Sequence, residues 1–384
     1  MEILTYKTIS ELATISDAWD RLSEQELTFV PSFSELRYQL EAGGSKFRLL
    51  AAIENSQIIA IACFTYENAT KSYQLATRKL FHLPVKAVFL FGSCVLGQPS
   101  ENVIRKFFDV IIERSDFDVI DVGVIFVDSP LYNAITSLHH GFIAWSLMRK
   151  KHLRWLIRLP GSFDEYIASL PKRTRTHITR DCRKFEREAP DFRVMRLPEE
   201  VDIFLRDAEK ISRLTYQWNL GSRLCNDEST HQEFIRLAKN GTLRCYIVYL
   251  RDKPCAFGWG ELGHRTFTFH VTGYDPQYRK LSPGTALMMR MIRDLIENTN
   301  CEVFDFKWGS EDGYKSRLGN VSLSCARMQL ARIYRPYSFL LVVLDKMINV
   351  AKNFVMNLVE LIFGHGGLKQ RLKSTLRRFG IAIY

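Results

Sequence analysis

A pattern of hairpin, strand, turn, helix and strand occurs twice along this chain of 384 residues. Two apolar runs flank a short polar turn in residues 47–66 and again in residues 243–262, which predicts a β-hairpin in each place. The segments that follow, 86–123 and 265–309, each contain an apolar strand, a turn with Gly and Pro, an amphipathic helix and a second strand. The sequence therefore predicts a duplicated α/β fold, in which each copy is a mixed sheet with helices on its faces.

The closing strands of the two copies place Asp121 and Asp305 at matching points. We set the division between the copies near residues 150–160, where the first pattern has ended and the second has not begun. The second unit is predicted to begin with two helices, at about 162–189 and 199–218, and to end with a strand at 322–333. The expected parts of the chain are a first unit over 1–150, a second unit over 160–335 and a helical tail over 336–384.

The net charge of +11 is distributed unevenly. Residues 172–187 hold seven Lys and Arg against two acids, and residues 336–384 hold the same numbers, so each segment carries +5 (7 − 2). Two basic patches on an otherwise nearly neutral chain indicate local anionic contacts. No nucleic-acid-binding motif accompanies the charge, so we expect no nucleic acid as a partner.

The cysteines and the first residues of the chain indicate a compartment. The eight cysteines are scattered without metal-ligand spacing, so we expect reduced thiols and no metal site. Residues 1–20 contain acids and polar residues throughout and no secretory signal. These features predict a cytoplasmic protein.

The stretch YRKLSPGTALMM, residues 278–289, predicts a helix whose first turn lacks an acidic residue. Ser282 suits the N-cap, and Pro283 suits the first helical position because its missing N–H costs nothing there. The free N–H groups of a first turn carry partial positive charge, which acidic side chains normally offset. Here two cations, Arg279 and Lys280, precede the helix instead. We therefore expect the missing anion to come from a ligand, and a diphosphate fits such a site.

The segment RKLSPG, residues 279–284, resembles the pyrophosphate-binding segment of the GNAT acyltransferases, usually written Q/R-x-x-G-x-G/A. Arg279 and Gly284 match its first and last positions, whereas Ser282 stands where the first glycine is expected. The CelD/BcsL-type acetyltransferases, linked to bacterial cellulose and exopolysaccharide production, resemble this chain more closely. In that branch an S-P-G triplet precedes F-D, G and Y-K, and this chain has the same order in Phe304-Asp305, Gly309 and Tyr314-Lys315. Two such units in tandem also resemble the FemABX peptidyltransferases.

The resemblance implies an acyl-CoA donor, such as acetyl-CoA, and an amine acceptor such as an amino sugar. Tyr314 is expected to protonate the leaving thiolate. Three candidates for the base stay open: Asp305, which could instead pair with Lys315; His270, in the strand before the basic turn; and Glu261, which we interpret as a solvated edge residue. The residues expected to hold the donor are Thr272, Arg279, Lys280, Ser282, Gly284 and Thr285.

The first copy lacks the basic turn of the second. Its residues 92–102 contain no Lys or Arg, and its helix opens with Glu101, which already supplies the negative charge. We therefore expect the first unit to bind no CoA and to shape the acceptor cleft. The basic helix at 172–187 is either a solvated face or a wall for phosphates or an acidic acceptor.

The tail has an apolar helix at 338–363 and a basic amphipathic segment at 366–380. The helix contains too many polar residues for a membrane span. It is expected either to pack within the protein or to contact a membrane surface or a partner. Two other functions stay open for the whole chain: a FemABX-like aminoacyl-tRNA-dependent transferase and a non-catalytic scaffold that binds a partner.

Overall fold

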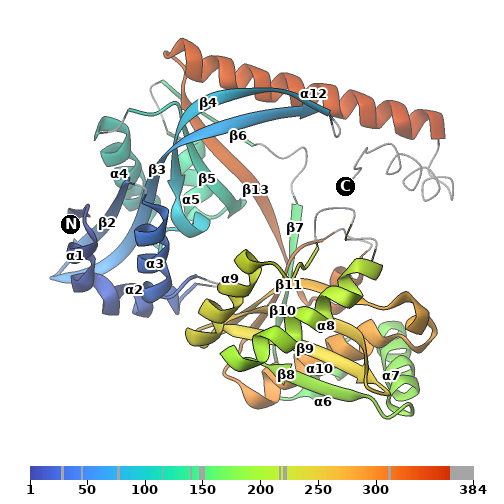
Figure 1. Ribbon diagram of the computed structural model, residues 1–384. Helices are drawn as coiled ribbons and strands as arrows, with labels where there is room; N and C mark the ends of the chain where they lie inside the picture. Colours follow the sequence, from blue (N-terminus) through green and yellow to red (C-terminus); the bar gives the residue numbers. More distant parts are fainter. Residues whose placement is uncertain are drawn as a thin grey trace. The chain divides into compact units, whose positions relative to one another are not determined.

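The computed structural model describes residues 1–26, 30–44, 46–75, 78–114, 116–138, 141–146, 152–215, 218, 223–309 and 313–363. The chain forms two compact units, whose elements are labelled in Figure 1. Unit 1 consists of Met1–Gln25, Leu36–His152 and Ser324–Tyr384, and unit 2 consists of Glu26–Glu35 and Leu153–Leu323.

Unit 1 is a mixed sheet with helices packed against it. The strands are β1 (Glu2–Tyr6), β2 (Lys46–Glu54), β3 (Gln57–Leu75), β4 (Arg78–Leu90), β5 (Val119–Phe126), β6 (Phe142–Ser146) and β13 (Val321–Arg332). The helices are α1 (Ile9–Leu12), α2 (Ser16–Ser23), α3 (Phe33–Gly43), α4 (Glu101–Arg114), α5 (Pro130–Thr136) and α12 (Pro336–Phe363). The strand order is β1-β2-β3-β4-β5-β13, with β6 also paired to β13. Only the pair β4–β5 is parallel among the pairs described in this unit. Helices α4 and α5 cover one apolar face of the sheet.

Unit 2 repeats this plan. The strands are β7 (His152–Arg158), β8 (Asp191–Met195), β9 (Leu243–Leu250), β10 (Lys253–Gly263), β11 (Thr266–Tyr274) and β12 (Val303–Gly309). The helices are α6 (Phe163–Ser169), α7 (Lys172–Glu186), α8 (Val201–Leu214), α9 (Glu228–Lys239), α10 (Pro283–Asn298) and α11 (Tyr314–Leu318). The strand order is β7-β12-β11-β10-β9-β8, in which β11 and β12 are parallel. Helices α6, α7 and α10 pack on one face of the sheet, and α8 and α9 pack on the other.

The structure confirms the predicted duplication in its details. Both predicted hairpins form, as β2–β3 and β9–β10. Their turns, Asn55-Ser56 and Arg251-Asp252, place all four residues at positive φ, which is the conformation of the tight hairpin turn that matches strand twist. The segment β4-α4-β5 in unit 1 corresponds to β11-α10-β12 in unit 2. The fold is therefore a mixed α/β architecture used twice.

The division into units differs from the expected boundaries at 150, 160 and 335. Strand β7 pairs antiparallel with β12 and belongs to unit 2, whereas β13 pairs antiparallel with β5 and belongs mainly to unit 1. Each sheet is thus completed by a strand from the other half of the sequence. The helix predicted at 162–189 is two helices, α6 and α7, because Leu170 and Pro171 interrupt it with extended backbone.

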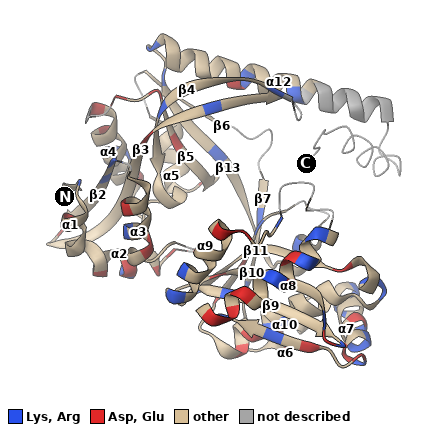
Figure 2. Ribbon diagram, in the orientation of Figure 1, with Lys and Arg blue, Asp and Glu red and all other residues tan. Residues whose placement is uncertain are grey.

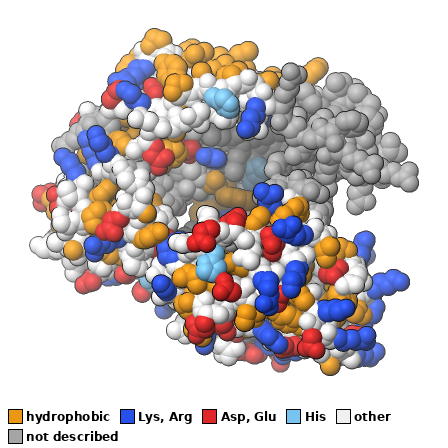
Figure 3. All heavy atoms as spheres, viewed as in Figure 1, with side chains coloured by type: hydrophobic (Ala, Val, Ile, Leu, Met, Phe, Trp, Pro, Cys, Tyr) orange, Lys and Arg blue, Asp and Glu red, His pale blue; other side chains and the backbone are white. Residues whose placement is uncertain are grey.

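The tail helix α12 packs against unit 1 through one face. Ser338, Leu341 and Val342 are buried, and the nearly buried carboxylate of Asp345 accepts hydrogen bonds from Lys71 Nζ at 2.6 Å and Trp145 Nε1 at 3.1 Å. Apolar side chains on the other face are exposed, and Figure 3 shows orange side chains along the helix. None of the described helices is both long and apolar enough to span a membrane. The basic segment predicted at 366–380 lies outside the described residues.

Candidate functional site

The N-terminus of α10 carries no acid and no side-chain cap. The helix begins at Pro283, and Ser282 occupies the N-cap position, as predicted. Ser282 has a φ of 56°, in the left-handed region, and its side chain makes no hydrogen bond to the first turn. The first turn of α10 contains no acidic residue, whereas Arg279 and Lys280 end the 3-10 turn Pro276–Leu281 that leads into it. The positive end of the α10 dipole is therefore offset by no side chain of its own first turn.

A pocket of about 860 Å³ opens at this helix end. Its lining includes six of the nine predicted site residues: Thr272, Arg279, Ser282, Gly284, Thr285 and Tyr314. The lining does not include Lys280, His270 or Asp305. Arg317 on α11 adds a second cation to the pocket, and no local pattern indicates it because only the fold brings α11 to α10. Gly284 lies beside Tyr274, whose ring would be 3.2 Å from an added Cβ, so a larger residue would crowd this wall.

Beside the pocket the two parallel strands separate. Strands β11 and β12 pair only over Thr266–Thr268 and Val303–Asp305. Beyond Asp305, β12 stays paired with β7, and β11 stays paired with β10. Thr272 Oγ1 on β11 donates to the carbonyl of Phe257 on β10 at 2.7 Å. Among the described residues, the part of β11 from 269 to 274 has no partner on β12. The end of this part of β11, at Thr272, Gly273 and Tyr274, lines the pocket.

His270 lies in a β-bulge next to this opening. The register of β10 and β11 passes from Trp259↔Val271 to Gly260↔Phe269, which leaves His270 as the extra residue. Its ring stacks on Trp259 with a centroid distance of 4.3 Å and an interplanar angle of 5°. The bulge fixes the ring at the face of the sheet that α8 and α9 cover.

His270 contacts a cation through one ring nitrogen and a carboxylate through the other. Nδ1 lies 3.0 Å from Lys307 Nζ, which can donate to it, and Nε2 lies 2.7 Å from Glu261 Oε1. The second contact is close but not aligned, so Nε2 is buried without a hydrogen-bond partner among the described residues. When Nδ1 accepts from Lys307, the neutral ring carries its proton on Nε2, which faces the Glu261 carboxylate.

Glu261 is not the solvated edge residue that the sequence indicated. Its side chain is only 16% exposed, and it faces His270. Burial and the charge of Glu261 raise the pKa of neighbouring Glu233 on α9. Burial lowers the pKa of Lys307, against the opposing influence of Glu261 and Asp305. The sequence missed this cluster because the bulge brings together side chains that simple strand alternation would not align.

Asp305 is paired, but not with Lys315. Its carboxylate is fully buried and binds Arg154 through two guanidinium nitrogens, with Nε 2.9 Å from Oδ2, and it accepts the N–H of Lys307 at 2.7 Å. Lys315 instead donates to the carbonyl oxygens of Phe306 and Trp308, and burial lowers the pKa of Lys315 to about 8. The predicted alternative of a structural pair between Asp305 and Lys315 is therefore wrong, because Asp305 pairs with Arg154.

The same carboxylate arrangement recurs in unit 1. Asp121 accepts the N–H of Gly123 at 2.8 Å and a hydrogen bond from Arg327 at 3.0 Å. Because this arrangement holds the end of the corresponding strand in both copies, it favours a structural role for Asp305 over a role as base. Two residues later the backbone of both copies is left-handed, with a φ of 78° at Gly123 and 58° at Lys307. The copies differ there in the residue, which is a glycine in unit 1 and a lysine in unit 2.

Lys307 thus holds a left-handed conformation that is unfavourable for a residue with a Cβ. Strained residues of this kind concentrate at functional sites. The amine of Lys307 contacts Nδ1 of His270 at 3.0 Å. Sequence reasoning did not single out Lys307, because no local pattern reveals a positive φ at a lysine.

Tyr314 is the first residue of α11 and lines the pocket with its side chain 40% exposed. Its ring meets Phe306 edge-on at 6.0 Å, which holds it near the end of β12. Its role as an acid stays a prediction.

The basic helix α7 contributes to the pocket without its arginines. Figure 2 shows Lys and Arg along this helix. Arg173, Arg180 and Arg187 are exposed, and Arg180 pairs with Asp181 of the same helix. The α7 residues that line the pocket are Thr174, His177, Ile178 and Asp181. The geometry therefore favours the interpretation of a solvated basic face. Within the described part of the chain, no group of His, Cys, Asp and Glu side chains could hold a metal ion.

The site of unit 2 thus combines an uncapped helix end behind a strand, two separating parallel strands and a bulge beside them. The strand-helix-strand plan that holds it recurs in unit 1. Residues 172–316, from α7 into α11, match the family model described as Acetyltransferase (GNAT) domain. None of the curated proteins compared with this chain matches it.

Among solved structures, the chain is similar to "Crystal structure of FemX", with 12% identity, a TM-score of 0.58, and coverage of 88% of this chain and 99% of that one. It is also similar to a conserved protein of unknown function from Bacteroides thetaiotaomicron VPI-5482, with 15% identity, a TM-score of 0.48, and coverage of 86% and 100%. A tandem GNAT protein from the clavulanic acid biosynthesis pathway has 10% identity, a TM-score of 0.42, and coverage of 86% and 98%. The likeness to FemX extends over both units and concerns the fold.

Proposed function

We propose that this protein is an N-acyltransferase whose unit 2 binds an acyl-CoA and transfers the acyl group to an amine. The observation that carries the proposal is the uncapped N-terminus of α10, which opens into the pocket with Arg279 and Arg317. A diphosphate there meets the N–H of Gly284, the helix dipole and two guanidinium groups, whereas the N–H groups of Thr285 and Ala286 donate to the carbonyl of Ser282. Gly284 keeps the approach to the helix end open, and the pocket volume is in the range of small-ligand sites.

The chemistry requires few protein groups. The amine nitrogen bonds to the acyl carbon and the carbon–sulfur bond breaks, so the products are an amide and the CoA thiol. Backbone N–H groups of β11, beyond its last pair with β12, stabilise the oxyanion of the tetrahedral intermediate. The amine proton passes to a base, and the thiolate takes a proton from an acid.

We assign the base to His270 and the acid to Tyr314. His270 lies two residues along β11 from Thr272 in the pocket wall. With its Nε2 proton facing Glu261, the ring takes up the amine proton at Nδ1, in place of the hydrogen bond from Lys307. Lys307 and Glu261 act as positioning residues that hold the ring from its two sides. Tyr314 enters the pocket from α11, on the side of Arg317.

The acceptor that we propose is an amino sugar or a polysaccharide precursor. This choice rests on the resemblance to the CelD/BcsL-type acetyltransferases in the order S-P-G, F-D, G and Y-K. Release of free thiol from acetyl-CoA, measured against a panel of amino sugars, amino acids and simple amines, tests it. Release with no amine of the panel above the rate of hydrolysis would contradict the acceptor class.

Donor binding is tested by thermal denaturation with CoA and with acetyl-CoA. A ligand that binds only the folded protein raises its stability by about 3 kcal/mol at one hundred times its Kd. We expect Arg279→Glu to abolish this stabilisation. Lys280→Glu is the matched control, because it changes the charge equally at the next residue but lies outside the pocket lining. Equal losses in both variants would show a general charge effect and contradict the site.

A second candidate is a FemABX-like transfer from aminoacyl-tRNA. The exposed arginines of α7 and the fold likeness to FemX over both units favour it. Stabilisation by a charged tRNA and not by CoA would support this candidate. Stabilisation by neither would favour a scaffold without catalysis.

We also propose that the outer face of α12 contacts an anionic membrane surface. Leu340, Met347, Val350 and Phe354 are 44% to 68% exposed and follow helical spacing on one side, with Lys346 and Lys352 exposed nearby. The sequence beyond residue 363 adds five Lys and Arg and no acid. An apolar stripe beside lysines fits the acyl and headgroup layers of such a surface.

A further inference from the structure

A second pocket, of about 990 Å³, lies in unit 1 on the sheet beyond the end of α4. Its side chains come from the end of β1, the start of β2, the middle of β3 and of β4, and the segment after α4. Four cations line it: Lys7, Lys46, Arg48 and Lys86. This site is built entirely within unit 1, so it is separate from the pocket at α10.

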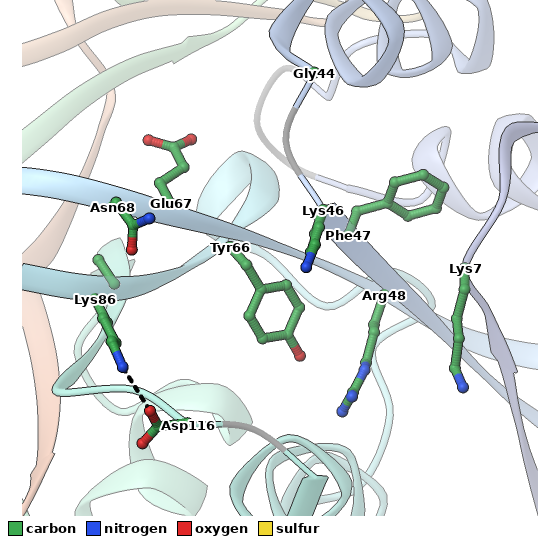
Figure 4. A pocket seen from close by; sticks show the side chains of 11 residues that line it. Lys7, Gly44, Lys46, Phe47, Arg48, Tyr66, Glu67, Asn68, Lys86 and Asp116 are labelled. Carbon is green, nitrogen blue, oxygen red and sulfur yellow. Dashed lines mark hydrogen bonds and ion pairs between the residues drawn. The ribbon is translucent and has the colours of Figure 1, made fainter.

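The cations share one face of the sheet. On β2, Arg48 stands two residues before the core residue Leu50, and Lys46 stands two residues further. Since alternate residues of a strand point to the same side, both lie on the face that α4 covers. Figure 4 shows Lys46, Arg48 and Lys7 pointing to one side together with Tyr66, whereas Glu67 points to the other.

The charge of the pocket is only partly balanced. Lys86 pairs with Asp116 at 2.7 Å, and Arg48 lies over the ring of Tyr66 at 5.5 Å. Lys7 is near one carboxylate, because Glu11 accepts the backbone N–H of Lys7 at 2.6 Å and the charge of Lys7 helps to lower the pKa of Glu11. Grouped cations repel one another, and an anion that bridges them removes this cost.

The strand register sets the size of the anion. Lys46 is opposite Tyr66 in the pair β2–β3, and Lys86 is opposite Asn68 in the pair β3–β4. Neighbouring strands are about 5 Å apart, so cations that extend from β1 to β4 cover roughly 15 Å. A single carboxylate reaches cations on only one strand, whereas two linked phosphates reach cations on neighbouring strands and longer chains of phosphates reach further.

We propose that this pocket binds a small molecule that carries a di- or oligophosphate. Lys46, Lys7 and Arg48 contact the phosphate oxygens, and the Lys86–Asp116 pair closes the site. Charge-assisted hydrogen bonds from several cations favour phosphate over a neutral ligand of the same size. The site does not depend on the acyl-donor proposal, because none of its residues belongs to unit 2.

Inorganic pyrophosphate is the probe, measured by isothermal titration calorimetry on the full chain at low salt. Because the α10 pocket also attracts pyrophosphate, the measurement uses the Arg279→Glu background. We expect one remaining site per chain, weakened about tenfold or more by Lys46→Glu and again by Lys7→Glu, each a loss of charge-assisted contact. Lys106→Glu, an exposed lysine of α4 outside the pocket lining, should leave the affinity within twofold.

The proposal would be overturned by no pyrophosphate bound in the Arg279→Glu background, by binding unchanged in Lys46→Glu, or by an equal loss in Lys106→Glu. Citrate, which carries similar charge on carboxylates, should bind at least about tenfold more weakly than tripolyphosphate, and equal affinity would also contradict it. If CoA still stabilises the Lys46→Glu variant, this site is separate from the donor site. If CoA fails to stabilise the Arg279→Glu variant alone, that result tests the donor site and not this one.

Discussion

The backbone at Lys307 offers a direct test of the site geometry through substitution by Gly and by Ala. The two variants remove the same amine and the same stem, so their difference reports the Cβ alone. At a φ of 58° a Cβ costs about 1 kcal/mol, which a glycine avoids. In ordinary strand backbone the preference is reversed, because glycine is about 0.5–1 kcal/mol worse than alanine. We therefore expect Lys307→Gly to be more stable than Lys307→Ala by about 1 kcal/mol.

For a unit of this size such a difference corresponds to about 2–4 °C in Tm, which calorimetry measures readily. Lys253, an exposed residue of β10 without positive φ, is the control position, and there the alanine variant should be the more stable of the pair. Both variants at 307 should lower kcat/KM about tenfold or more, since each removes the amine that holds His270. A more stable alanine at 307 would show that the strand is not left-handed there, and the case for a strained functional lysine would fail.

Three further predictions concern buried charge and the surface of α12. Asp305→Asn should destabilise unit 2 by about 3 kcal/mol, because it leaves the mostly buried Arg154 without a carboxylate. Asp121→Asn should cost less, since its partner Arg327 is half exposed. Equal losses of unfolding free energy in urea would contradict the burial argument. The pKa of Lys315 is about 8 in the folded protein and near 10.5 when unfolded, so between these pH values the unfolded chain binds the extra proton and stability rises with pH. Lys315→Met should flatten this rise between pH 8 and 10, and an unchanged slope would assign it to other groups. Phe354→Glu should reduce cosedimentation with vesicles of anionic phosphatidylglycerol but leave the weak binding to neutral phosphatidylcholine unchanged, and full binding by the variant would exclude α12 as the contact.

Much of the architecture could be predicted from the sequence because it is recorded in local patterns. Strand alternation and polar turns located both hairpins, and Ser282 with Pro283 located the start of α10. The pairing of β7 with β12 and of β13 with β5 could not be predicted, because the pairing of strands far apart in sequence leaves no trace in local periodicity. The predicted boundaries therefore followed the repeat and not the sheets.

The chemistry of the site was less accessible to sequence reasoning. Asp305 was recognised as an unusual carboxylate in an apolar strand, but its partner Arg154 lies 151 residues away on the exchanged strand. Glu261, in a hairpin arm, is predicted as a solvated edge residue, but it lies two residues from Trp259 on β10 and faces the same side of the sheet. Only the bulge at His270 shows that Glu261, His270 and Lys307 form one cluster.

The pairing of β7 with β12 and of β13 with β5 limits where the chain can be divided into fragments that fold. A fragment that started at Gly161 would contain β8 through β12 and lack β7, which leaves the edge of β12 unpaired and prone to aggregation. A fragment that ended at Ser146 would lack β13 and expose β5 in the same way. We therefore expect each fragment to be insoluble when it is expressed alone. Coexpression should not restore a soluble protein, because neither fragment contains β7.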